Sequence, residues 1–408
     1  MTTVKEVKPA SVPLSRNKLL GVAGVGWMFD AMDVGILSFV IAALAVDWGL
    51  NSQQMGWIGS VNSIGMAVGA LVFGVLADKI GRKQIFMWTL VLFSVASGLS
   101  ALTTTLAAFL ILRFFVGMGL GGELPVASTL VSESVPAKER GRVVVLLESF
   151  WAAGWLLGAL ISYFVIPDYG WRVALILTAI PAFYALYIRM KLPDSPQFAA
   201  NATAKTRSVF QNMRDLLAKP YRKQTLVLWV LWFAVVFSYY GMFLWLPSVM
   251  TGKGFDLITS FKYVLIMTLA QLPGYFTAAW FIEKFGRKFV LVTYLIGTAA
   301  SAYVFGNSET VAMLLGAGMA LSFFNLGAWG ALYAYTPEQY PTVNRGTGAG
   351  TAAAIGRVGG IFGPLLVGSM LTKGYDISVI FSVFCIAILI GAAAVLFFGK
   401  ETKQTELQ

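Results

Sequence analysis

Long apolar runs, separated by shorter polar segments, make up most of the chain. Each run has about 20 residues, which is the length that an α-helix needs to cross the hydrocarbon core of a bilayer. The pattern therefore predicts an all-α membrane protein with twelve transmembrane helices. The expected spans are 19–46, 55–77, 85–104, 106–131, 143–166, 172–191, 225–249, 262–282, 289–306, 310–333, 346–371 and 377–398.

One long polar connection divides the spans six and six. The expected order is a cytoplasmic N-terminal tail (1–18), an N-terminal six-helix bundle (19–191), a cytoplasmic central loop (192–224), a C-terminal six-helix bundle (225–398) and a cytoplasmic tail (399–408). Lys and Arg indicate this orientation, because they accumulate in cytoplasmic loops. With the N-terminus inside, 24 of the 30 Lys and Arg residues fall in inner segments and four in outer loops. We expect a multi-pass protein of the cell membrane.

The composition supports this class and excludes others. Hydrophobic residues make up 58% of the chain and charged residues 12%, which is more apolar than a soluble domain can bury. The net charge of +11 follows from the inner loops, so we expect no nucleic-acid partner. With no histidine and a single cysteine, Cys385, no cysteine-based metal site is expected and proton transfer falls to carboxylates. The chain has no GxxxxGK(S/T) phosphate loop and no nucleophile–base constellation, so we expect neither an ATP-driven pump nor an enzyme, and no cofactor.

The two halves of the chain share an internal repeat. Three sets of residues recur at one offset of 205: Asp78 and Gly81 with Glu283 and Gly286, Glu133 and Arg140 with Glu338 and Arg345, and Gly154 and Gly158 with Gly359 and Gly363. Parallel repeats of this kind build one large class of secondary transporters. The repeat therefore predicts two pseudo-symmetric six-helix bundles.

Several motifs resemble those of the major facilitator superfamily. The segment GVLADKIGRK (74–83) is similar to the superfamily's signature between spans 2 and 3. Arg113 and the glycines after it resemble its span-4 motif. LPDSPQF (192–198) is similar to the Pro-Glu-Ser-Pro-Arg element of the sugar-porter and organic-ion branch, with Asp194 and Gln197 as departures. The resemblance covers essentially the whole chain and implies the major facilitator fold and alternating access.

Charged residues at the inner ends of the helices are candidates for a cytoplasmic gate. A carboxylate beside an Arg or Lys can make charge-assisted hydrogen bonds in one state of a transporter and release them in another. The alternative is that these charges only anchor the loops inside, but their acidic partners recur in both halves. The candidate gate residues are Asp78, Gly81, Arg82, Glu133, Arg140, Glu283, Arg287, Glu338 and Arg345.

Ionisable residues within the N-terminal spans are candidates for proton coupling. A charge in the bilayer centre is costly, so it usually lines a cavity or has a partner. Asp30 and Asp33 share a helix face, and two close carboxylates cannot easily both ionise, so we expect this pair to hold a proton. Arg113 and Glu123 lie nearly three turns apart and can face the same cavity. The alternatives are structural or static ion pairs, and Glu148, near the inner end of its span, fits either packing or a latch.

The C-terminal spans contain one ionised residue, Arg357. Its planar guanidinium suits a carboxylate, so we expect it either to bind a substrate anion or to pair with an acid across the cavity. The other candidate ligands are Trp27, Asn62, Tyr239, Tyr240, Gln271, Asn325 and Trp329. Aromatic faces suit a flat ring, and Asn and Gln suit an amide or a ring nitrogen.

The overall pattern resembles the branch of bacterial metabolite/proton symporters that contains niacin/nicotinamide transporters. The segments that carry this resemblance are FDAMDVGIL (29–37), GMGLGGELPVAST (117–129) and RGTGAGTAAAIGRVGG (345–360). It implies proton-coupled uptake of a small aromatic carboxylate or vitamin such as niacin or nicotinamide, by a monomer in the lipid bilayer. A benzoate-type acid or sugar symporter, a drug or metabolite efflux antiporter, and a non-coupled channel or sensor stay open as alternatives.

Overall fold

The computed structural model describes residues 16–80, 82–133, 137–181, 183–184, 214 and 216–403, and its regular elements there are helices. They are α1 (Arg16–Asp47), α2 (Ser52–Ile80), α3 (Arg82–Ser100), α4 (Leu106–Glu133), α5 (Ala137–Leu177), α9 (Arg222–Phe243), α10 (Leu246–Gly252), α11 (Leu257–Leu269), α12 (Gln271–Phe285), α13 (Arg287–Gly306), α14 (Val311–Glu338), α15 (Thr342–Thr372) and α16 (Ile377–Phe398). Nine helical segments within the described ranges are long and apolar enough to cross a membrane, and α3 and α4 contain shorter apolar helices. The prediction of an all-α membrane protein is confirmed.

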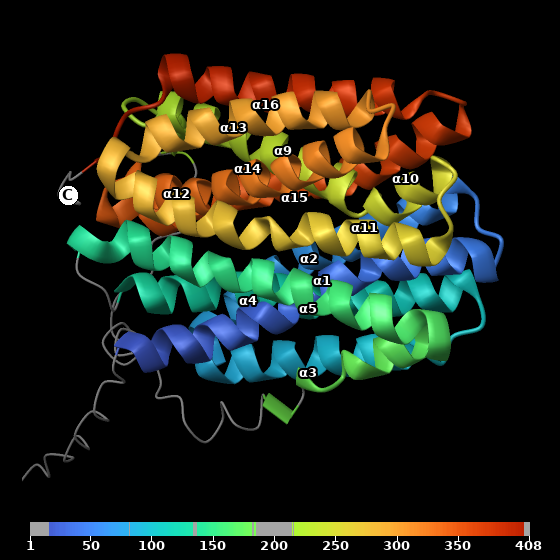
Figure 1. The fold of residues 1–408 in the computed structure, drawn as a ribbon. Helices are drawn as coiled ribbons and strands as arrows, with labels where there is room; N and C mark the ends of the chain where they lie inside the picture. The colour runs from blue at the N-terminus through green and yellow to red at the C-terminus, as the bar shows by residue number, and fades with distance from the viewer. Residues whose placement is uncertain are drawn as a thin grey trace, which may run out of the picture.

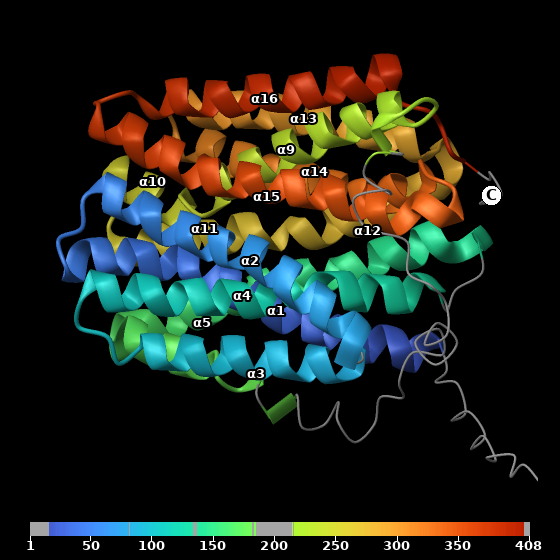
Figure 2. The same ribbon diagram turned by 180° about the vertical axis from the view of Figure 1, so that it is seen from behind.

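The helices form two bundles that lie side by side. In Figure 1 the blue-to-green helices α1 to α5 lie below helices α9 to α16, which run from yellow-green to red, and Figure 2 shows the same arrangement from behind. The prediction of two pseudo-symmetric bundles is confirmed. The expected central loop and the two tails fall largely outside the described residues, so the domain boundaries stay predictions.

The internal repeat reappears in the packing of the helices. In the N-terminal bundle, Gly154 and Gly158 of α5 lie against the backbone carbonyls of Met28 and Met32 of α1. In the C-terminal bundle, their counterparts Gly359 and Gly363 of α15 lie against the carbonyls of the α9 residues at positions 233 and 237. Both partners in each contact are shifted by the same 205 residues. A Cβ at any of these glycines would collide with the facing backbone, so small residues permit the close approach in both halves.

Two spans that the apolar pattern predicts as continuous are broken by proline. The span 225–249 divides into α9 and α10, and the span 262–282 belongs to α11 and α12. Proline has no N–H to donate to the carbonyl four residues earlier and clashes with it. Helix α9 ends at Phe243, four residues before Pro247, and α11 ends at Leu269, four residues before Pro273.

The two expected spans 143–166 and 172–191 also differ from prediction. Helix α5 continues to Gly170, whose positive φ of 80° is the non-helical point at which two helical segments join. A hydrogen-bonded turn at Thr178–Ile180 then interrupts the second segment, with each N–H bonded to the carbonyl three residues earlier. This turn brings the Thr178 side chain to α3, as described below.

The bundles touch closely where α2 begins and α15 ends. Gly56 and Gly59 of α2 lie against Pro364, and the Ser60 hydroxyl donates to the carbonyl oxygen of Ile361 at 2.7 Å. A Cβ at Gly56 would stand 2.9 Å from the Pro364 carbonyl oxygen, so a larger residue would separate the helices here. In the expected orientation this contact lies at the outer face of the membrane.

Candidate functional site

A completely buried ion pair lies inside the N-terminal bundle. Arg113 Nη1 of α4 donates to Asp33 Oδ2 of α1 at 3.1 Å, and both side chains have no exposed surface. The Ser97 hydroxyl of α3 donates to the other Asp33 oxygen and accepts from Arg113 Nη2 at 3.1 Å. Thr178 donates to the same Ser97 oxygen at 2.6 Å. Four segments thus converge on one carboxylate and one guanidinium.

The hydrogen bonds of this network depend on the charge state of Asp33. Asp33 receives one hydrogen bond on each oxygen, and a proton on either oxygen would compete with a donor that now holds the carboxylate. The Arg113 guanidinium also lies 5.3 Å from the centre of the Phe109 ring, which supplies a further partner for its charge. Protonation of Asp33 would therefore weaken the contacts that join α1 to α3 and α4. The Glu123 side chain lies outside the described residues, so its part in this network stays a prediction.

The second aspartate, Asp30, occupies a different environment from Asp33. Its side chain is buried, with 2% exposed, and lies within electrostatic range of the Tyr240 hydroxyl of the other bundle. The two carboxylates of the Asp-x-x-Asp motif therefore interact with different groups. Asp33 belongs to the N-terminal bundle, whereas Asp30 lies near the contact between bundles.

Arg357 lies at that same contact. Its Nη1 donates to the Tyr240 hydroxyl of α9 at 3.3 Å and to the thioether sulfur of Met66 of α2 at 3.1 Å. Neither of these two acceptors is an anion, and both are weak acceptors compared with a carboxylate. The guanidinium thus extends from the C-terminal bundle to the N-terminal bundle. A stronger acceptor, such as a carboxylate, could replace its present partners.

A cluster of aromatic side chains fills the space between the bundles. Trp27 of α1 packs against Trp151 of α5 with ring centroids 5.1 Å apart. Trp151 in turn stacks on Trp329 of α14 at 6.4 Å and donates from its indole nitrogen to the Tyr239 hydroxyl at 2.8 Å. Tyr239 also contacts Trp329 at 4.8 Å and Tyr240 at 5.3 Å. Four of the expected ligands, Trp27, Tyr239, Tyr240 and Trp329, are therefore brought together.

The expected amide ligands are buried with unsatisfied polar atoms. Asn62 Oδ1, Asn325 Oδ1 and both amide atoms of Gln271 make no hydrogen bond to any atom of the described residues. Buried polar groups in proteins almost always have partners, so such atoms call for a ligand or water. Gln271 begins α12, directly after the helix break at Ala270.

Sequence reasoning missed several members of these clusters. Trp151 and Met66 are common core residues, and nothing in the sequence distinguishes them from the many others. Ser97 carries no motif. Glu148, for which the sequence predicts a packing or latch role, is 1% exposed and lies beside the indole N–H groups of Trp27 and Trp329, and its role stays a prediction. The spacing of Glu148 and Trp151, one helical turn, was the available signal.

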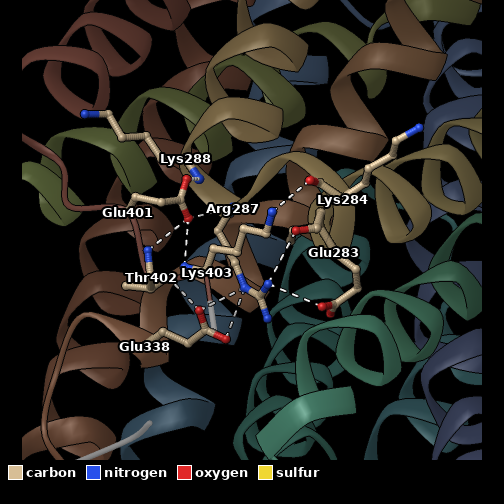
Figure 3. Close-up of polar contacts among 9 residues, drawn as sticks. Glu283, Lys284, Arg287, Lys288, Glu338, Glu401, Thr402 and Lys403 are labelled. Carbon is tan, nitrogen blue, oxygen red and sulfur yellow. Dashed lines mark hydrogen bonds and ion pairs between the residues drawn. The ribbon is translucent and has the colours of Figure 1, made fainter. Parts of the chain in front are cut away.

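The candidate gate residues of the C-terminal half form a compact charged cluster. As Figure 3 shows, Arg287 at the start of α13 points between two acids, Glu283 of α12 and Glu338 of α14. Its Nε donates to Glu338 Oε2 at 3.1 Å and its Nη1 to Glu283 Oε2 at 3.4 Å. Arg345 donates from Nε to the carbonyl oxygen of Pro337 at 3.2 Å. The structure therefore brings together three of the expected gate residues, with the fourth bonded to the adjoining turn.

The C-terminal segment completes this cluster (Figure 3). Glu401 accepts hydrogen bonds from the backbone N–H groups of Arg287 and Lys288 at 2.9 and 3.1 Å, and Thr402 donates to Glu338 at 2.6 Å. An acid at a helix start satisfies free N–H groups and the helix dipole. The N-terminal gate residues Asp78, Gly81, Arg82, Glu133 and Arg140 have side chains, or in the case of Gly81 a position, outside the described residues. Their role stays a prediction.

Comparisons with known proteins agree on the family to which this chain belongs. The model of the Major Facilitator Superfamily matches residues 23–274 and 263–408. A Bacillus subtilis (strain 168) protein that bears the provisional name niacin/nicotinamide transporter NiaP is 67% identical over 97% of this chain and 99% of its own. The niacin transporter NiaP of Acinetobacter baylyi is 44% identical over 100% of this chain and 99% of its own. The xylose transporter XylE of E. coli, partially occluded and inward open, shares the fold with a TM-score of 0.78 at 18% identity, over 96% of this chain and 99% of its own.

Proposed function

Because this chain belongs to the major facilitator superfamily, it is a multi-pass membrane transporter of a small molecule and not an enzyme, and we propose that it imports niacin together with protons. The observation that carries this proposal is Arg357, whose guanidinium lies between the bundles beside a cluster of tryptophan and tyrosine rings. A guanidinium binds a carboxylate in a planar, bidentate manner, and aromatic faces pack well on a flat ring. Niacin offers both groups, and the relatives named above are named for it.

The substrate would replace weak contacts by strong ones. In the present arrangement, Arg357 bonds to a phenol and a thioether. A carboxylate would accept charge-assisted bonds that are about twice as strong. The neutral amide of nicotinamide would gain less from Arg357, so we expect the acid to be preferred over the amide. Unsatisfied buried amides at Asn62, Gln271 and Asn325 are candidates to orient the ring.

The buried aspartates are the proposed proton sites. Asp33 is held by Arg113 inside the N-terminal bundle, so its protonation would release a cation that must find another partner. Such a change of partners is the kind of two-state element that can shift a transporter between conformations. Asp30 lies within electrostatic range of the Tyr240 hydroxyl, which also bonds to Arg357, so the charge of Asp30 would respond to an anion bound at Arg357.

The charged cluster around Arg287 is the proposed cytoplasmic gate of the C-terminal half. We place both termini in the cytoplasm and the protein, as a monomer, in the lipid of the cell membrane, on the basis of the Lys and Arg distribution. The contact of α2 with α15 would then close the outer face, and it would part when the site opens outward.

Transport into proteoliposomes tests the proposal. Purified protein is reconstituted, and uptake of radiolabelled nicotinate and nicotinamide is followed with and without an inward-directed proton gradient. We expect the gradient to drive accumulation of nicotinate, and Arg357→Gln to abolish it. Asp33→Asn is expected to abolish gradient-driven accumulation but to leave exchange of nicotinate across the membrane. Absence of uptake and of binding for both compounds would refute the substrate, and benzoates, sugars and drugs would be tested next.

A further inference from the structure

Glu148 is a buried carboxyl group that the proposed mechanism does not use. It lies on α5, one helical turn before Trp151, and 1% of the residue is exposed. Its Oε2 atom accepts no hydrogen bond from the residues that the structure describes. A buried carboxyl oxygen without a donor is costly, so its presence at this position requires a compensating group.

The surroundings of Glu148 come from both bundles. The indole N–H groups of Trp27 on α1 and Trp329 on α14 lie beside the carboxyl group, and the Tyr275 hydroxyl of α12 lies within electrostatic range. Both indole N–H groups interact with the carboxyl group, but neither meets the distance and angle of a normal hydrogen bond, and the Tyr275 hydroxyl also lacks such a partner among the described residues. Polar atoms from three other helices, none of them in a hydrogen bond of normal geometry, thus gather around one carboxyl group in a region lined with aromatic rings. Such a set of convergent polar groups among apolar walls is typical of a ligand site.

Glu148 and Arg357 also belong to one neighbourhood. Both lie within electrostatic range of the Tyr333 hydroxyl of α14. Tyr333 packs on Trp329 with ring centroids 6.0 Å apart. The site therefore presents a cation and a carboxyl group near the same aromatic wall.

We propose that Glu148 binds the ring nitrogen of a pyridine-carboxylate substrate whose carboxylate is bound by Arg357, and that Glu148 thereby selects pyridine acids over benzene acids. This inference rests on the proposed function, since it assigns a second group to the same substrate. One proton, taken from solvent, lies between the carboxyl oxygen and the ring nitrogen, because both atoms are acceptors without it. Benzoate has a C–H at this position and leaves the Glu148 oxygen without a partner.

Paired ligands and variants test this assignment. Nicotinate and benzoate differ only in the ring nitrogen, so the ratio of their dissociation constants isolates that atom. We expect the wild-type protein to bind nicotinate about tenfold or more tighter than benzoate, as for a buried hydrogen bond that involves a charged group. In Glu148→Leu, the ratio should fall to within about threefold, with benzoate binding retained. Glu148→Gln should restore most of the preference, because its amide N–H donates to the ring nitrogen without an added proton.

A neighbouring variant controls for general disturbance of α5. Ser149 donates only to the carbonyl of Leu146 in its own helix among the described contacts, so Ser149→Ala should keep the nicotinate-to-benzoate ratio of the wild type. An unchanged ratio in Glu148→Leu, in protein that still transports nicotinate, would overturn this inference and leave the proposed function intact. Failure of the wild-type protein to bind nicotinate would overturn both. A loss of both ligands in Glu148→Leu together with a loss of preference in folded Glu148→Gln would assign Glu148 a structural role.

Discussion

The buried pair of Asp33 and Arg113 makes a quantitative prediction about stability. At 3.1 Å and an effective dielectric constant of about 20, the two unit charges attract by about 5 kcal/mol. Most of this offsets the cost of removing both charges from water, so the pair as a whole contributes little. Loss of one partner, however, leaves the other charge buried. We therefore expect Asp33→Leu and Arg113→Met each to lower the free energy of unfolding by about 3 to 5 kcal/mol.

The double variant should behave differently from either single variant. With both charges replaced by apolar groups, no charge remains unpaired, and we expect a loss within about 1 to 2 kcal/mol of the wild type. Unfolding in mixed micelles of lipid and denaturing detergent, followed by tryptophan fluorescence, measures each value. Arg172→Gln is the control, because its contact with Asp47 at 3.7 Å is half exposed and such pairs contribute at most about 1 kcal/mol. Losses that simply add in the double variant would refute the reasoning, since they would show two independent sites.

Two further predictions concern packing and the gate. Gly363→Ala places a Cβ about 2.5 Å from a facing carbonyl oxygen, so we expect the free energy of unfolding to fall by about 1 to 3 kcal/mol. In the control variant Gly350→Ala, on the same helix, the Cβ meets nothing within 4 Å, so stability should not change. Equal melting temperatures of the two variants would contradict this reasoning. Glu401→Gln removes the negative charge of the group that accepts hydrogen bonds from the first N–H groups of α13, so hydrogen exchange there should accelerate. Glu309→Gln, in the exposed loop before α14, should leave it unchanged. Slow exchange in Glu401→Gln would show that another group holds this helix start.

The large features of the fold were accessible from the sequence because they depend on length and repetition. Apolar runs long enough to cross a bilayer give the spans, and a common offset gives the two halves. The breaks at residues 243 and 269 were not predicted, because averaging hydropathy over a window hides a single missing N–H at Pro247 or Pro273. The relevant signal was one residue type, whose effect falls four residues earlier in the chain.

The site was predicted only in part, for a similar reason. Sequence position gives the depth of a charge along its helix, and this depth drew attention to Asp33, Arg113 and Arg357, whose roles stay predictions. The depth of a charge does not reveal which residues of other helices contact it. The Asp33 carboxylate pairs with a residue 80 positions away, and Glu148 is covered by aromatic residues of three other helices. Only the packing of the bundles determines these neighbours.

The glycine contacts repeated in both halves have a mechanical consequence. Where backbone touches backbone, as at Gly154 and Gly359, no side chains intervene that could change rotamer and let the helices slide. We therefore expect each glycine-matched pair of helices to move as one rigid unit. Bending is left to the places where the backbone is already interrupted, such as Ala270 and the break after Phe243. We expect the candidate binding groups to move with these rigid helix pairs, and bending to occur near the prolines. The exposure of the site could then change while each half keeps its own shape.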